Sequence, residues 1–328
     1  MILLPAVLVV AGVVLLYLGA EWLVRGATHI SAVAGVSPVV VGLTVVSVGT
    51  SAPELVVCVL AALEGSPDLA VGNVLGSNLA NVGLILGLVA VIRPMEVAGG
   101  VIRRDIPWML LVTMMVLPLM LDLEVGRLDG FILAVVLSLY LVYLARVWRR
   151  QSPQVLGEAA RRLEPIPGAP AAPSRGGMVR PIALVVVGSL MLMGGGHLVV
   201  TGATDIAELL GVGQLTIGLS VVAVGTSLPE LAATLVAVGR KEADLAVGNI
   251  VGSNLFNLTL VLGGTALVSP IAIPERVLLV EYPAVLLLSL VLLPLAFSQR
   301  RITRIEGAFL LCLYAGAWFW IANSMPVF

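Results

Sequence analysis

Residues 48–55 read VGTSAPEL, and residues 224–231, which lie 176 positions later, read VGTSLPEL. A second pair of matches follows at the same offset: residues 69–81 read LAVGNVLGSNLAN, and residues 245–257 read LAVGNIVGSNLFN. The shared positions are mainly polar residues, glycine and proline, which apolar sequences do not share by chance. Two polar segments interrupted by Gly and Pro, at matching places in two apolar halves, are typical of a transporter's substrate site.

The sequence around these motifs is strongly apolar. Hydrophobic residues make up 59% of the 328 residues and charged residues 11%, whereas a soluble domain carries about 25% charged residues. A membrane-spanning helix needs about 20 apolar residues. We therefore predict an all-α polytopic membrane protein with ten spans, near residues 2–24, 37–63, 68–91, 105–122, 128–148, 180–204, 213–239, 244–267, 277–297 and 306–325.

The duplication predicts the domain organisation. It divides the chain into an N-terminal repeat (1–148), a linker loop rich in Pro, Gly and Ala (149–179) and a C-terminal repeat (180–328). Each repeat holds five predicted spans, an odd number, so equivalent helices cross the membrane in opposite directions. The predicted fold is thus ten transmembrane helices arranged as two inverted five-helix repeats.

The basic residues predict the orientation, because Lys and Arg collect on the cytoplasmic side of a membrane protein. With an external N-terminus and ten spans, all 18 basic residues except Arg127 and Arg276 fall on the cytoplasmic side. We therefore predict a multi-pass protein of the cell (inner or plasma) membrane, with both termini extracytoplasmic and the linker loop cytoplasmic. No basic surface indicates a nucleic-acid partner, and the oligomeric state stays open.

Proline within each motif predicts a broken helix. Pro53 and Pro229 cannot donate the backbone hydrogen bond that the carbonyl four residues earlier would accept, so we expect free carbonyls near Gly49 and Gly225. Such carbonyls are hard oxygen ligands that suit Na⁺ or Ca²⁺. Side chains at i, i+3, i+4 and i+7 share one helical face, which holds Ser47, Thr50, Ser51 and Glu54 in the first copy and Ala223, Thr226, Ser227 and Glu230 in the second.

Glu54 and Glu230 are the acidic residues that lie well inside predicted spans in both halves. A charged carboxylate at the bilayer centre costs about 2.5–3.5 kcal/mol or more, so such a residue indicates function. Two carboxylates facing one cavity suit one Ca²⁺ or several Na⁺ ions, whereas Mg²⁺ demands a tighter octahedral shell. Soft metals would need thiolate or His clusters. We expect no cofactor apart from the transported ions.

Other repeated residues favour structural roles. Asp68 and Asp244 open predicted helices, where a carboxylate caps N–H groups. His29 and His197 do not occupy equivalent positions, which argues against a proton relay. We expect close helix packing at the motif glycines, which are Gly42, Gly72, Gly76 and Gly83 with their counterparts Gly218, Gly248 and Gly252.

At these residues the chain resembles prokaryotic sodium/calcium exchangers of the calcium:cation antiporter superfamily, over essentially its whole length. The resemblance implies a transporter rather than an enzyme, exchanging Ca²⁺ for Na⁺ by alternating access, with the cation site at the midplane between the two repeats. Carried over by position, it implies metal ligation by Ser47, Thr50, Ser51, Glu54, Ser77 and Asn81 in the first repeat and by Ala223, Thr226, Ser227, Glu230, Ser253 and Asn257 in the second. Ser47 and Ala223 would contribute backbone carbonyls.

Three departures from family patterns keep alternatives open. Asn257 stands where the potassium-dependent branch carries Asp, which argues against K⁺ co-transport, and Ser47 replaces a common alanine. The Ca²⁺/H⁺ branch typically has GNxxE, whereas Gly76 and Gly252 occupy the acidic position here. A Ca²⁺/H⁺ antiporter, or one for another divalent cation, is the alternative. A channel is a further one, and a serine hydrolase would need a base such as His, which neither serine motif contains.

Overall fold

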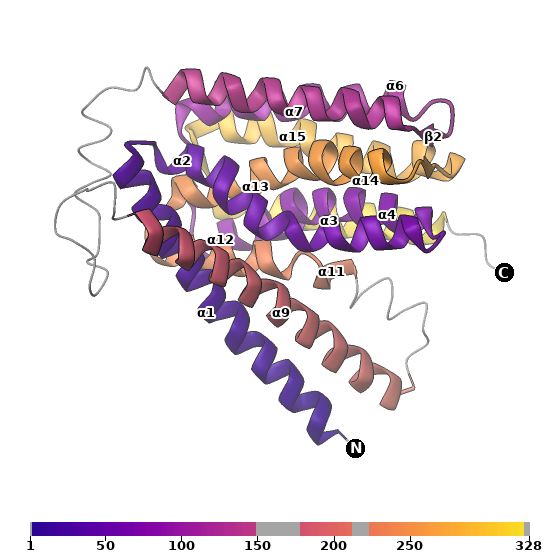
Figure 1. Cartoon of the computed structure of the whole chain (residues 1–328), viewed down its shortest axis with the longest axis horizontal. Helices are drawn as coiled ribbons and strands as arrows, with labels where there is room; N and C mark the ends of the chain where they lie inside the picture. Colours follow the sequence, from indigo (N-terminus) through magenta and orange to yellow (C-terminus); the bar gives the residue numbers. More distant parts are fainter. Residues whose placement is uncertain (1, 149–177, 212–222, 325–328) are drawn as a thin grey trace. The chain divides into compact units, whose positions relative to one another are not determined.

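The computed structural model describes residues 2–148, 178–211 and 223–324. These residues are mostly helical (Figure 1), and eight of their helices are long and apolar enough to cross a membrane. The uninterrupted helices among them are α1 (Leu3–Ala34), α7 (Arg127–Trp148), α9 (Val179–Leu209) and α16 (Arg304–Asn323). The prediction of an all-α polytopic membrane protein is confirmed.

The other four long helices each contain a π-helical segment, a stretch with a wider turn. They are α2 (Pro38–Val41), η1 (Gly42–Val46) and α3 (Ser47–Leu63); α4 (Pro67–Leu79), η2 (Ala80–Leu86) and α5 (Gly87–Ile92); α13 (Ala243–Phe256), η6 (Asn257–Val261) and α14 (Leu262–Val268); and η7 (Val277–Glu281) with α15 (Tyr282–Gln299).

Two of the ten predicted spans are not among these eight helices. The span near 105–122 corresponds to the shorter α6 (Ile106–Leu119), which follows η3 (Val101–Asp105). The span near 213–239 lies partly outside the described residues and continues into α11 (Ala223–Gly225) and α12 (Leu228–Gly239). The count of ten spans therefore stays a prediction.

The chain forms two compact units that do not follow the two sequence repeats. Unit 1 consists of Met1–Thr50 and Leu141–Asn249, and unit 2 of Ser51–Tyr140 and Ile250–Phe328. Each unit draws segments from both repeats, and the boundary between them runs through α3, α7 and α13. The division of the chain into repeats and linker stays a prediction about sequence symmetry.

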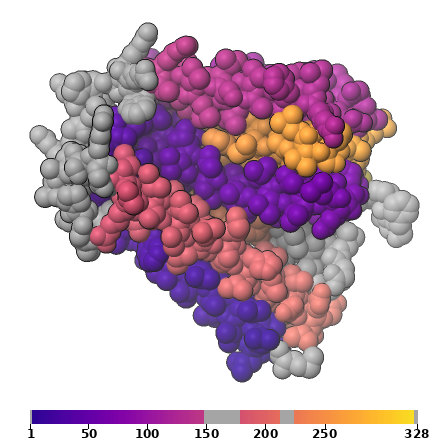
Figure 2. Space-filling model, viewed as in Figure 1, coloured from indigo at the N-terminus to yellow at the C-terminus, as the bar shows by residue number. Residues whose placement is uncertain are grey.

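In unit 1, α1 and α9 lie side by side along their length, and their surfaces meet without a gap (Figures 1 and 2). The contact rests on small residues, because a Cβ atom added to Gly12 would lie 2.7 Å from Gly195 O, and one added to Gly19 would lie 2.8 Å from Gly188 O. Glycine lets helix backbones approach this closely in a membrane. The residues recur every seven positions, as Pro5, Gly12, Gly19 and Gly26 on α1 and Pro181, Gly188, Gly195 and Gly202 on α9.

In unit 2, α16 packs on α5 and η2, and α15 packs on α6. Short antiparallel strands complete the unit: β1 (Met95–Glu96) pairs with β4 (Arg301–Ile302), and β2 (Glu124–Val125) pairs with β3 (Ile271–Ala272). Buried Asp105 accepts hydrogen bonds from Arg104 Nε at 2.6 Å and from Tyr140 Oη at 3.3 Å, which compensates its charge.

The motif glycines divide into two groups. Gly42 and Gly248 pack against each other's helices in unit 1, where a Cβ atom on Gly248 would lie 2.6 Å from Val39 O. Gly83 packs closely against Tyr314 in unit 2. A Cβ atom on Gly72 or Gly76 would meet no heavy atom within 4 Å, so the prediction of close packing is wrong for these two positions. Gly218 lies outside the described residues.

Candidate cation-binding site

The first motif lies on a continuous helix. Ser47, Thr50, Ser51 and Glu54 follow one another on α3 at the predicted helical spacing, and all four side chains are buried. Pro53 lies inside this helix, so the prediction of a break near Gly49 is wrong. A proline inside a helix removes only one backbone hydrogen bond, so a membrane helix can continue through it.

The second motif is broken, as predicted. Helix α11 ends at Gly225, Thr226 and Ser227 are not helical, and α12 begins at Leu228. Pro229 lies in the first turn of α12, where its missing N–H removes no helical hydrogen bond. Glu230 follows in the same turn, and its buried carboxylate lies near the positive end of the helix dipole.

In unit 1, the predicted ligands of the first copy contact Asn249, which shares the predicted helical face of Ser253 and Asn257 but was not among the ligands carried over by position. Ser47 Oγ donates to Gly42 O at 2.8 Å and approaches Asn249 O at 3.1 Å. Thr50 Oγ1 donates to Asn249 Oδ1 at 3.2 Å, and Asn249 Nδ2 lies 3.4 Å from Thr234 Oγ1. The hydroxyl that distinguishes Ser47 from alanine therefore bonds to helix carbonyls. The repeat of Asn249 at Asn73 was the available sequence signal.

In unit 2, the predicted ligands Ser77 and Asn81 are buried on α4 and η2. Asn81 Nδ2 donates to Asn254 Oδ1 at 3.0 Å, and Asn78 Nδ2 donates to Asn254 O at 3.2 Å. Sequence reasoning missed both Asn78 and Asn254, which are equivalent positions of the two repeats. Their partners depend on how the helices rotate against each other, which helical spacing alone does not specify.

Several predicted ligands keep polar atoms without a hydrogen-bond partner among the described residues. A buried polar atom without a partner costs about 1–3 kcal/mol, and in a native structure each one calls for an explanation such as an ion. The atoms that belong to predicted ligands are Ser77 Oγ, Asn81 Oδ1, Ser227 Oγ, and Asn257 Oδ1 and Nδ2. Their oxygens are of the hard type that Na⁺ and Ca²⁺ prefer.

Two predicted asparagine ligands occupy matching places in π-helical segments. Asn81 is the second residue of η2, and Asn257 is the first residue of η6. Single π-helical turns inside α-helices occur frequently at functional sites. The wider turn is therefore a feature of both copies, and the sequence carries no obvious signal for it.

Each compact unit contains one motif carboxylate together with predicted ligands from both repeats. Unit 1 holds Ser47, Thr50, Ala223, Thr226, Ser227 and Glu230; unit 2 holds Ser51, Glu54, Ser77, Asn81, Ser253 and Asn257. Every member of the unit 2 group is buried.

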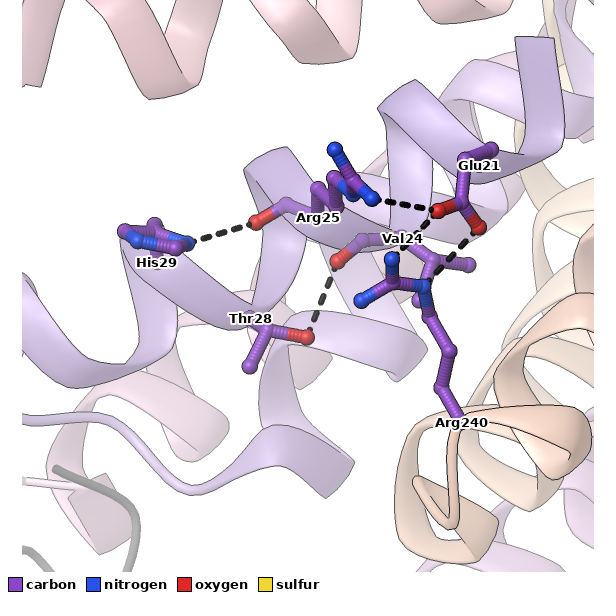
Figure 3. Close-up of polar contacts among 6 residues, drawn as sticks. All are labelled: Glu21, Val24, Arg25, Thr28, His29 and Arg240. Carbon is purple, nitrogen blue, oxygen red and sulfur yellow. Dashed lines mark hydrogen bonds and ion pairs between the residues drawn. The ribbon is translucent and has the colours of Figure 1, made fainter. Parts of the chain in front are cut away.

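An ion-pair cluster in unit 1 joins α1 to the end of α12 (Figure 3). Arg240 binds both carboxylate oxygens of Glu21, with its Nε 2.9 Å from Oε2, and Arg25 Nη2 lies 2.9 Å from Glu21 Oε1. The His29 ring contacts Arg25 O at 3.1 Å within its own helix.

Asp68 and Asp244 lie in the first turns of α4 and α13, where helix capping was predicted.

Known proteins with similar sequences are membrane proteins and ion exchangers. The sodium/calcium exchanger protein family matches residues 4–149 and 180–322. Inner membrane protein YrbG of Escherichia coli (strain K12) is 38% identical over 88% of this chain and 87% of its own length. The sodium/calcium exchanger MaX1 of Methanosarcina acetivorans is 30% identical over 92% of this chain and 94% of its own.

The solved structure of the sodium-calcium exchanger NCX_Mj has the same fold. It superposes with a TM-score of 0.81 at 29% identity and covers 99% of this chain and 100% of its own. The exchangers it resembles are transporters, in agreement with the prediction that the protein is not an enzyme. The fold of this chain, its duplicated motifs and the family match lead to one conclusion: the chain belongs to the sodium/calcium exchanger protein family.

Proposed function

We propose that the protein is a secondary active antiporter that exchanges Ca²⁺ for Na⁺ across the membrane by alternating access. The observation that carries the proposal is the burial of one carboxylate from each motif copy, with Glu54 and Glu230 both 0% exposed. Each is accompanied in its unit by buried neutral oxygen ligands. An intramembrane carboxylate is costly unless it binds a partner, and a transported cation is such a partner.

We assign the ligands by their chemistry. Ca²⁺ binds chiefly to Glu54 and Glu230 together with the hydroxyls of Thr50 and Thr226, because Ca²⁺ prefers several hard, negatively charged oxygens. Na⁺ ions use the neutral oxygens around the same carboxylates, so the two cations compete. The full set, at the midplane between the two repeats, is Ser47, Thr50, Ser51, Glu54, Ser77, Asn81, Ala223, Thr226, Ser227, Glu230, Ser253 and Asn257.

Ser47 and Ala223 contribute their backbone carbonyls. The Ser47 hydroxyl donates to Gly42 O at 2.8 Å, and we assign the backbone carbonyl of this residue to the ion. The carbonyl of Ala223 lies in α11, directly before the break at Thr226. Carbonyls at an interrupted helix are typical Na⁺ ligands in transporters.

Sodium coupling is supported over proton coupling by the residues beside the ligands. Gly76 and Gly252 occupy the positions at which the proton-coupled branch carries an acid. Asn257 is an amide, which has no titratable proton to exchange. A relative named as a sodium/calcium exchanger, MaX1, aligns along nearly the whole chain.

The membrane arrangement is part of the proposal. Residues 1–148 and 180–328 form inverted repeats joined by a cytoplasmic linker at 149–179, with both termini extracytoplasmic. The excess of Arg and Lys on one side supports this orientation. Single cysteines placed in the linker should react with an impermeant thiol reagent only from the cytoplasmic side.

Transport measurements test the proposal directly. Purified protein in liposomes should take up radiolabelled Ca²⁺ when Na⁺ is trapped inside, and not when an outward H⁺ gradient or no gradient is imposed. Uptake driven by H⁺ alone would move the protein to the Ca²⁺/H⁺ class and overturn the sodium assignment. Single-channel conductance without coupling would overturn antiport itself.

A further inference from the structure

We propose that Asn254 is a positioning residue for the ion site: it orients the side-chain amide of Asn81 so that the oxygen, and not the nitrogen, faces the bound Na⁺. The inference rests on the proposed function, in which Asn81 is an ion ligand. It adds a residue that binds no ion itself. Both residues lie in unit 2, and both are buried.

An asparagine ligand has an orientation problem. Its amide carries an oxygen that can bind a cation and an NH₂ group that repels one, and the two ends have nearly the same shape. Rotation by half a turn would therefore replace a ligand by a positive dipole. In a buried site, only a hydrogen-bond partner distinguishes the two orientations.

Asn254 supplies that partner. Asn81 Nδ2 donates to Asn254 Oδ1 at 3.0 Å, which occupies the nitrogen end of the amide. Asn81 Oδ1 then remains buried and has no hydrogen-bond partner within the described residues. The oxygen is thus the end left for an ion.

One further contact holds the orientation of the Asn254 amide: its Nδ2 lies 3.7 Å from Met109 Sδ, a weak acceptor. The backbone carbonyl of Asn254 accepts from Asn78 Nδ2 at 3.2 Å, a contact that does not depend on the direction of the amide. If the Asn254 amide were reversed, its NH₂ group would face the NH₂ group of Asn81. Both contacts of the Asn254 amide therefore require the same orientation, with Nδ2 toward Met109 and Oδ1 toward Asn81.

Asn254 acts through Asn81, because its own polar atoms are engaged: Oδ1 with Asn81, Nδ2 with Met109 and the carbonyl with Asn78. Its sequence counterpart Asn78 has a different role. Asn78 donates to the backbone of Asn254, and its own Oδ1 has no partner in the part of the chain that the structure describes. Identical residues in the two motif copies therefore do not have identical functions.

The test uses two variants that lack the acceptor Oδ1, Asn254→Leu and Asn254→Ala. Two variants are used so that the result stands even if one of the variant proteins does not fold. Partners outside the first coordination shell typically change metal affinity by 10–100-fold, and we expect a rise of about tenfold in the Na⁺ concentration for half-maximal exchange. The Ca²⁺ concentration for half-maximal exchange should change less than about twofold, since outer partners act through the ligand they touch. Thr113→Val is the control, because it removes a buried 2.9 Å hydrogen bond to Met109 O in the same unit.

A second ligand change separates positioning from structural damage. Asp at position 81 has two equivalent oxygens and needs no orientation. In the Asn81→Asp background, Asn254→Leu should therefore no longer raise the half-maximal Na⁺ concentration. An equal rise in both backgrounds, or a rise equal to that of Thr113→Val, would overturn the positioning role.

Asn81→Ala tests the ligand role of Asn81 separately from the positioning role of Asn254. If it raises the half-maximal Na⁺ concentration while both Asn254 variants leave it unchanged, the positioning role is wrong and the ion site stands. If Asn81→Ala itself leaves Na⁺ dependence unchanged, the assignment of Asn81 as a ligand fails, and the role of Asn254 fails with it. A larger effect of the Asn254 variants on Na⁺ than on Ca²⁺, absent in the Asn81→Asp background, establishes the inference.

Discussion

The two copies of the GTS-PEL motif have nearly the same sequence and different backbones. In the first copy, α3 continues from Ser47 through Pro53. In the second, the helix stops at Gly225 and restarts at Leu228, with Pro229 in the first turn of α12. The place of a proline relative to the helix start therefore decides its effect, because an N–H in the first turn has no helical partner to lose.

The same difference gives the two carboxylates unequal surroundings. Glu54 lies in the interior of α3, whereas Glu230 lies in the first turn of α12. A helix N-terminus stabilises a nearby negative charge by about 0.3–1 kcal/mol, and by up to about 2 kcal/mol when partly buried. Residues that are equivalent in sequence are thus expected to respond differently when the backbone around them is changed.

The largest expected effect comes from removing either charge. Glu54→Gln and Glu230→Gln should each lower Na⁺-driven Ca²⁺ flux at least about 100-fold, because Ca²⁺ would lose a charged ligand inside the membrane. Glu64→Gln neutralises an exposed carboxylate after α3 and serves as the control. A charged ligand contributes strongly to Ca²⁺ affinity. Flux within about twofold of wild type in either motif variant would therefore contradict the site assignment.

The prolines test the backbone comparison itself. Pro53→Ala restores a donor inside α3 and should stabilise that helix, by up to the roughly 3 kcal/mol that an interior proline costs, while slowing exchange through a stiffer helix. Pro229→Ala should change stability little, since its N–H would lie in the first turn. Thermal unfolding in detergent and flux assays measure both. Equal changes in the unfolding temperature of the two variants would show that the two prolines do not differ in their effect on the backbone.

The ion pair on α12 has no counterpart in the first copy. The positions equivalent to Glu21 and Arg240 are His197 and Glu64. Because the pair is bidentate and mostly buried, Glu21→Gln or Arg240→Gln should lower the free energy of unfolding by about 1 kcal/mol. The double variant should cost less than the sum of the two, and strict additivity in a double-mutant cycle would show that the contact contributes nothing.

The smallest effect is expected where the two copies agree. Asn73 Nδ2 lies 3.3 Å from Cys58 Sγ, and at the equivalent positions Asn249 Nδ2 lies 3.4 Å from Thr234 Oγ1. Cys58→Thr gives the first copy the residue of the second and should change the free energy of unfolding by less than about 1 kcal/mol, since one acceptor replaces another. A tenfold loss of flux in this variant would show that the two contacts are not equivalent.

The sequence predicted the helical class, the shared helical face of the first motif and the break in the second motif. Helical periodicity and the proline rule are local, so they could be read from the chain. The continuity of α3 at Pro53 was not predictable in this way, because packing decides whether a helix that contains proline breaks or continues. The glycine spacing on α1 and α9 was readable and was overlooked, whereas the contacts of Asn249 and Asn254 depend on helix rotation.

The most direct test of the central claim is competition between the two ions at equilibrium. Binding of radiolabelled Ca²⁺ to purified protein would be measured while Na⁺ replaces choline at constant ionic strength, in wild type, Glu54→Gln and Glu230→Gln. We predict that Na⁺ displaces Ca²⁺ from the wild type and that each variant loses Ca²⁺ binding. Ca²⁺ binding that is insensitive to Na⁺, or that persists in either variant, would contradict a shared site built from both motif copies.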